Sequence, residues 1–189
     1  MRKELKDFNW HVYGLSLSDY EYTFQIVTEV IRDRKKQLQQ KIDTLEVFDG
    51  DGNLIDLSTG EGDEAIDDIS YYNYIENLYL WHFGLWRLQG VFEGILKQEF
   101  FHQEKLPGLK SKLDFIKKLN YRISQSDYDE ILEWGKLRNA LSHHPPEQYR
   151  PCELEEKDLK EYYELVKRIT EDLLEQKEKN NDPTKTPMR

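Results

Sequence analysis

Three residues within a single six-residue stretch, Arg138, Asn139 and His143, carry side chains suited to phosphate chemistry. An arginine guanidinium can donate two parallel hydrogen bonds to phosphate oxygens. A histidine imidazole can accept and release a proton near neutral pH, so it can act as a general acid or base. The stretch ends just before His144 and Pro145, where the chain must leave the helical conformation. We therefore treat these three residues as a candidate catalytic group near the end of a helix.

The spacing around this group predicts that it faces a second partner. At 100° per residue, one stripe of the helix is apolar and suited to the core: Trp134, Leu137 and Leu141. A neighbouring sector mixes small, apolar and hydrogen-bonding residues: Ile131, Leu132, Gly135, Arg138, Asn139, Ser142 and His143. Gly135 has no side chain to keep a partner away. We therefore expect an interface on this sector.

A structural role for the same residues stays open. Arg138 could pair with Glu130 or Glu133 on its own helix, and His143 could stabilise the negative end of the helix dipole. Both roles are common on helix surfaces.

Other residues that could do chemistry fail on their spacing. The acidic turn 49–53 begins like a calcium loop but lacks the glycine and the bidentate glutamate that the loop requires. Glu99 and His102 resemble half of a di-iron site, and the chain has no second Glu-x-x-His pair. Cys152 is the single cysteine and follows a proline in an acidic segment. We expect no metal site and no cofactor.

The order of apolar residues predicts one all-α domain over residues 1–179, with a tail at 180–189 that we expect to be disordered. Capping boxes at Ser18 and Ser126 predict the start of the first and fourth helices. The expected helices are 18–43, 66–101, a short one after Pro107 and Gly108, 126 to the prolines at 145, and one around 159–173. An acidic insertion at about 44–64, read as a small hairpin and loop, separates the first two. The whole resembles a bundle of four to five helices.

The charge of this 189-residue chain is concentrated in that insertion. The net charge is -10, and residues 43–68 alone hold ten carboxylates and no Lys or Arg. The remaining residues are therefore neutral overall, and residues 105–122 carry six cations against Asp114 alone. This basic helix is either an ordinary solvated surface or a nucleic-acid contact. The absence of a long apolar segment and of a signal peptide, with a single cysteine, favours a cytoplasmic protein without a membrane span.

Residues 138–143, Arg-Asn-Ala-Leu-Ser-His, resemble the motif of the HEPN superfamily, an arginine followed after four residues by a histidine. The order of elements is also similar, since a long apolar helix, a short basic helix, the motif helix and an amphipathic helix span 66–175. The acidic hairpin resembles an insertion into that bundle.

The resemblance implies a metal-independent endoribonuclease that works as a homodimer, with two motif helices facing across a cleft. Arg138 would then hold the scissile phosphate, His143 would act as general base or acid, and Asn139 would orient either group. The cations on and after the short helix would contact RNA: Lys110, Lys112, Lys117, Lys118 and Arg122.

Two functional hypotheses follow. The first is a toxin or phage-defence effector that cleaves RNA and is held by an antitoxin or another defence protein. The second is a non-catalytic interaction module that binds a protein, a nucleotide or RNA, with the acidic hairpin suited to a basic protein partner.

Overall fold

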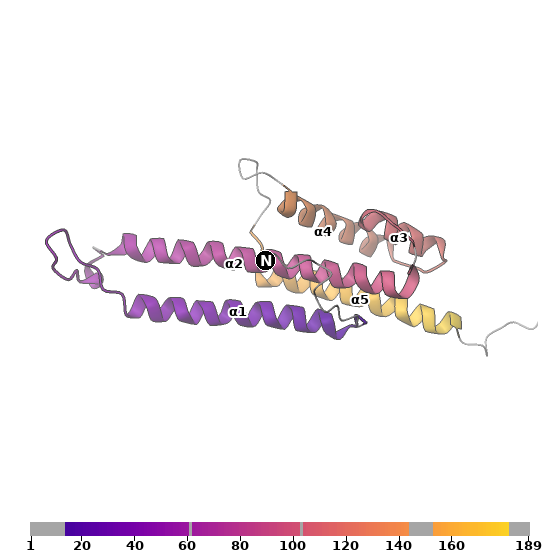
Figure 1. The fold of residues 1–189 in the computed structure, drawn as a ribbon, viewed down its shortest axis with the longest axis horizontal. Coiled ribbons are helices and arrows are strands. Elements are labelled where there is room, and N and C mark those ends of the chain that lie inside the picture. Colours follow the sequence, from indigo (N-terminus) through magenta and orange to yellow (C-terminus); the bar gives the residue numbers. More distant parts are fainter. Residues whose placement is uncertain (1–13, 61, 103, 144–152, 182–189) are drawn as a thin grey trace, which may run out of the picture.

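The chain is all-α, as the sequence predicts (Figure 1). The computed structural model describes residues 14–60, 62–102, 104–143 and 153–181. These residues form five α-helices and one short 3-10 turn, η2 (Leu57–Thr59). The helices are α1 (Ser18–Asp43), α2 (Asp63–Phe100), α3 (Gly108–Lys118), α4 (Gln125–His143) and α5 (Glu156–Asn181).

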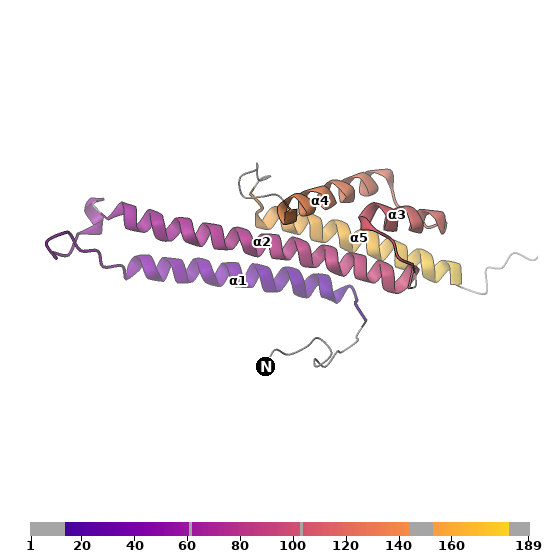
Figure 2. The ribbon, with the colours of Figure 1, turned by 45° about the horizontal axis from the view of Figure 1, so that its top comes forward.

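Helix α2 is the centre of the bundle and contacts each of the other four helices. Helix α1 lies antiparallel to it, α5 packs against both, and α3 and α4 lie together over the C-terminal half of α2 (Figures 1 and 2). A helix with neighbours on several sides must be apolar nearly all round, which is how 66–101 reads in the sequence. The prediction of a central helix is confirmed.

The core lies where α2 and α5 meet the first half of α1. Leu88 and Phe92 of α2 and Val166 of α5 are fully buried. Tyr20 of α1 is also fully buried, and its hydroxyl lies 2.9 Å from Oγ1 of Thr170 on α5. Burial of each large apolar side chain contributes roughly 1.5–3 kcal/mol, so this contact region provides most of the stability.

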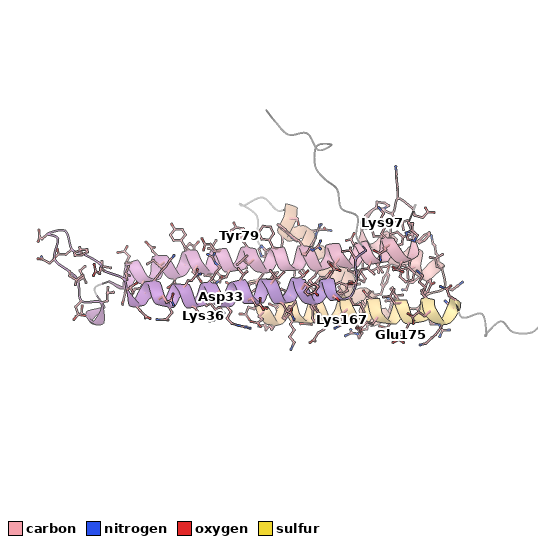
Figure 3. The ribbon with its side chains drawn as sticks, turned by 60° about the horizontal axis from the view of Figure 1, so that its bottom comes forward. Asp33, Lys36, Tyr79, Lys97, Lys167 and Glu175 are labelled. Carbon is pink, nitrogen blue, oxygen red and sulfur yellow. The ribbon has the colours of Figure 1, made fainter. Side chains whose placement is uncertain are left out.

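Residues 32–60 and 62–76 extend beyond the bundle as two helices with a connecting tip, which together we call the arm (Figures 1 and 2). No residue in 32–43 or 63–76 is fully buried, because α1 and α2 have only each other for contact there. Polar pairs replace the missing core, such as Arg34 with Glu76 across the arm. Figure 3 shows Asp33 and Lys36, which pair at 3.4 Å along α1, and Tyr79 pointing out from α2 near the base of the arm.

The tip of the arm differs from the expected hairpin. Phe48 and Leu54 form one isolated antiparallel bridge, and the described residues of the tip contain no strand. The turn between them is held by Asp49, whose carboxylate accepts hydrogen bonds from the Asn53 side chain and from the backbone N–H groups of Asn53 and Asp51. These bonds lower the pKa of Asp49. The turn explains the acidic spacing without a bound calcium ion.

Helix α1 begins at Ser18 as predicted, but the capping hydrogen bonds before α1 and α4 lie two residues upstream of the predicted capping boxes. The turn before α1 is closed by the backbone N–H of Ser16, which donates to the Asp19 carboxylate at 2.8 Å. Helix α4 is capped by Ser124, whose hydroxyl accepts from the backbone N–H of Asp127 at 3.0 Å. Both boxes therefore use the serine two positions upstream. At the other end of the chain α5 runs to Asn181, so residues 180 and 181 are helical, while 182–189 lie outside the described residues.

Candidate active site

The motif residues lie in the last two turns of α4. Arg138 is half-buried and Asn139 is exposed, and Nη1 of Arg138 donates to Oδ1 of Asn139 at 3.1 Å. Within the described residues Arg138 makes no ion pair, and Glu133 pairs instead with Lys136 at 2.5 Å. The described residues therefore do not support the structural role in which Arg138 pairs with Glu130 or Glu133. Nη2 of the guanidinium remains available to a ligand.

His143 is the last residue of α4, one turn after Asn139. The structure describes its helical backbone, and its side chain lies outside the described part. Its assignment as general acid or base therefore stays a prediction from the motif.

A groove of about 700 Å³ runs beside Arg138 between α2, α3 and α4. Its volume is in the range of small-molecule and nucleotide pockets, roughly 300–1,000 Å³. The polar and charged residues on its walls come from three helices: Gln89, Glu93, Lys110, Lys112, Asp129, Glu133, Lys136, Arg138 and Asn139. The groove therefore brings the motif together with part of the basic helix.

Two polar residues of α2 line the groove and were not predicted from the sequence. Nε2 of Gln89 donates to Oε1 of Glu93 at 2.7 Å, and the second oxygen of Glu93 pairs with Lys112 of α3. Gln89 is only 4% exposed. The sequence did contain a signal for this pair. Gln89 and Glu93 are four residues apart in the apolar half of α2, and polar side chains are rarely buried there without a partner.

Two buried polar atoms at this groove have no hydrogen-bond partner. One is the donor Nε of Arg138 and the other is the carbonyl oxygen of Gln89. The hydroxyl of Tyr162 on α5 is also buried without a partner, and burial raises the pKa of Tyr162 well above its usual value. Buried polar atoms left unpaired are uncommon in proteins, and each calls for an explanation such as a bound water, ion or ligand.

The five predicted RNA-contacting cations do not form a single track. Lys110 and Lys112 line the groove, whereas Lys117 lies over the ring of Tyr128, 3.7 Å from its centroid. Lys118 and Arg122 are exposed and are not part of the groove wall. Only the first two cations are therefore placed beside Arg138.

Gly135 has a close partner within the chain. A Cβ atom at this position would lie 3.0 Å from Cδ2 of Leu109 in α3. The missing side chain thus lets α3 approach α4, and it provides no support for an interface with a second chain. The homodimer stays a prediction.

The described residues contain no group of three His, Cys, Asp or Glu side chains placed to hold a metal ion. Their helices also include none with the length and apolar character of a membrane span. Glu99, considered above as a metal ligand, instead accepts a hydrogen bond from Lys177 at 2.8 Å, which lowers the pKa of Glu99.

Comparisons of the chain with protein-family models, curated proteins and solved structures found no match. The function is therefore argued from the groove and the motif themselves.

Proposed function

We propose that this protein is a HEPN-like endoribonuclease that cleaves RNA without a metal ion, with the groove between α2, α3 and α4 as the RNA site. The observation that carries the proposal is the position of Arg138 and Asn139 beside Lys110 and Lys112 in one groove of nucleotide size. The motif and the basic helix, 16 residues apart at their nearest members, were predicted from separate parts of the sequence.

The chemistry needs no water and no metal. The ribose 2′-oxygen attacks the phosphorus, His143 takes up the proton of the 2′-hydroxyl, and the bond from phosphorus to the 5′-oxygen breaks. A second histidine, His143 of the partner subunit, gives a proton to the leaving 5′-oxygen. The products are a 2′,3′-cyclic phosphate and a 5′-hydroxyl end.

Arg138 supplies the charge that the transition state needs. Its Nη2 has no partner among the described residues and can donate to the nonbridging phosphate oxygens, where negative charge builds up. Asn139 accepts a hydrogen bond from Nη1, so it holds the guanidinium at the groove wall. Helix α4 lies on the outside of the bundle, where a second copy can approach it (Figures 1 and 2).

The test is incubation of the purified protein with total RNA in excess EDTA. We expect the wild type to produce fragments ending in a 2′,3′-cyclic phosphate, and His143→Ala and Arg138→Ala to produce none. His102 is exposed and outside the groove, so His102→Ala serves as the matched control and keeps full activity. Full activity in His143→Ala, or no cleavage by a folded wild-type dimer, would reject the proposal.

As a toxin or phage-defence effector, the wild type should arrest bacterial growth when its synthesis is induced. We expect His143→Ala to be harmless at equal protein level, and an antitoxin or defence partner to appear as a suppressor of the arrest. Equal toxicity of both proteins would contradict a role that depends on RNA cleavage.

The arm favours a second candidate, a non-catalytic interaction module. Its side chains Phe48, Leu54, Tyr71 and Tyr72 are all more than half exposed, although large apolar residues usually avoid water. Together with the carboxylates of the tip they suit a basic protein with an apolar centre. Deletion of 49–62 should then abolish capture of that partner from cell extract while RNA cleavage stays unchanged. Retained capture would reject this module.

A further inference from the structure

Gln89 stands out because it is nearly buried in α2, lines the groove, and makes one of the four hydrogen bonds that its amide can form. Its amide nitrogen is bound to Glu93, and its carbonyl oxygen has no partner. The orientation of the amide follows from Glu93, because an ionised carboxylate only accepts hydrogen bonds and must face the NH₂ group. The atom left over is therefore an acceptor.

The groove thus presents different chemistry at its two sides. On the α2 side the Gln89 carbonyl oxygen is buried and has no partner, and the two Glu93 oxygens are already bound by Gln89 and Lys112. The α3 and α4 sides carry the donors Lys110, Lys136 and Arg138. The two carboxylates on the α4 side are already bound within that helix, Glu133 to Lys136 and Asp129 to Gln125. A ligand that fits both sides carries an anion at one end and an N–H donor at the other.

A nucleotide with an amino group on its base meets this requirement. With its phosphate against Arg138, its base can enter toward α2. The exocyclic amino group of adenine, cytosine or guanine can donate to the Gln89 carbonyl. Uracil has no exocyclic amino group, and its single N–H on this edge lies between two carbonyl oxygens that the Gln89 oxygen would repel.

We propose that Gln89 is a specificity-determining residue that selects RNA with an amino-bearing base, and disfavours uridine, on the 5′ side of the cleaved phosphate. This inference rests on the proposed ribonuclease function, and it names the substrate class of the same groove. Glu93 is a positioning residue that holds the Gln89 amide in the required orientation.

The experiment uses four DNA strands that each contain one ribonucleotide, rA, rC, rG or rU, in the same sequence context. Cleavage needs a 2′-hydroxyl, so only the phosphate after that single ribonucleotide can be cut. We expect wild-type kcat/KM for the rA, rC and rG strands to exceed that for rU by about tenfold, the effect of one hydrogen bond. Gln89→Met keeps the volume of the side chain and should lower the first three values to the level of rU, leaving rU unchanged.

Gln25 is exposed on α1, so Gln25→Met is the control for the substitution itself and should keep the preference. Equal wild-type rates on all four strands, or an unchanged preference in Gln89→Met, would overturn the inference while the ribonuclease proposal stands.

If none of the strands is cleaved, the ribonuclease proposal fails and binding decides the inference separately. The probes are then uncleavable 2′-O-methyl oligomers of A, C and U, with affinity measured by fluorescence polarisation. Weaker binding of the U oligomer, lost in Gln89→Met, would support base selection by Gln89. Equal affinities would overturn it.

Discussion

Substitution of Gly84 by alanine tests the packing of α2 against α5, because its effect on the unfolding free energy combines a gain in helix propensity with a loss from overpacking. Gly84 lies where α2 meets α5, and a Cβ atom there would lie 2.7 Å from Cδ2 and 3.2 Å from Cδ1 of Leu159. It would also lie 3.4 Å from Cγ1 of Val27 on α1. Leu159 is only 1% exposed, so its methyl groups cannot move into solvent to make room.

Gly90 on the same helix provides the matched control. It is exposed, and nothing lies within 4 Å of a Cβ atom built there. Alanine in a helix interior is favoured over glycine by about 1 kcal/mol, so Gly90→Ala should stabilise the protein by up to that amount. Gly84→Ala gains the same propensity but also overpacks a closed contact, which costs roughly 1–3 kcal/mol. The two variants should differ by about 1–3 kcal/mol, with Gly84→Ala the less stable.

Urea unfolding at 25 °C, followed by circular dichroism, measures this difference directly. The slope of unfolding free energy against urea concentration should be the same in both variants, so the midpoints report the free energies. If Gly84→Ala stabilised the protein as much as Gly90→Ala does, α2 and α5 would not be in the close contact described above. The position of α4, which packs on both of these helices, would then be in question as well.

Three further predictions concern stability. Tyr20→Phe should lower the unfolding free energy by about 1 kcal/mol, measured in urea, because the buried Tyr20 hydroxyl loses its hydrogen bond to Thr170. The hydrogen bond from Lys177 lowers the pKa of Glu99, so this pair stabilises the fold above about pH 4.5 and the stabilisation is lost as pH falls through the lowered pKa. Glu99→Gln should therefore weaken the fall in urea midpoint between pH 7 and pH 3, and an unchanged fall would contradict the pairing. Asn120 has φ 66°, so Asn120→Ala should cost about 1 kcal/mol while Asn120→Gly costs little, measured by the same urea titration.

The existence and order of the helices could be predicted from the sequence because each carries a regular apolar pattern. Helix α5 shows this most clearly, with Leu159, Val166 and Leu173 buried along one stripe. The capping boxes were misplaced because two serines two positions apart flank the start of each helix, Ser16 and Ser18 at α1 and Ser124 and Ser126 at α4. The local sequence alone could not decide which of the two serines caps the helix.

The core-facing side of α4 was only partly predictable. Trp134, Leu137 and Leu141 pack at the edge of the core, as predicted, but they stay half-buried. The deepest residue of α4 is Ile131, followed by Tyr128, because α4 contacts α3 as well as α2 and α5. A helix with neighbours on two sides buries a wider sector than one apolar stripe indicates.

The groove itself could not be predicted, because its walls come from segments far apart in the chain. Gln89 and Glu93 lie almost 50 residues before Arg138, and nothing in the local sequence joins them. The basic helix was recognised from its composition, but composition did not show that Lys112 pairs with Glu93 or that Lys117 lies over Tyr128. Such pairings depend on the packing of α3 against α2 and α4.

The net charge of -10 does not conflict with an RNA site in this groove, because the fold separates the two. The carboxylates of the tip are at the start of α2, and Gln89 lies 26 residues after Asp63 on the same helix. At a rise of 1.5 Å per residue this separation is about 40 Å. Exposed charges are screened over roughly 8 Å at physiological ionic strength, so the tip exerts almost no repulsion on a phosphate bound at Arg138. The charges nearest to such a phosphate are those of the groove wall, where Lys112 pairs with Glu93 and Lys136 with Glu133. Lys110 and Arg138 remain without a carboxylate partner among the described residues.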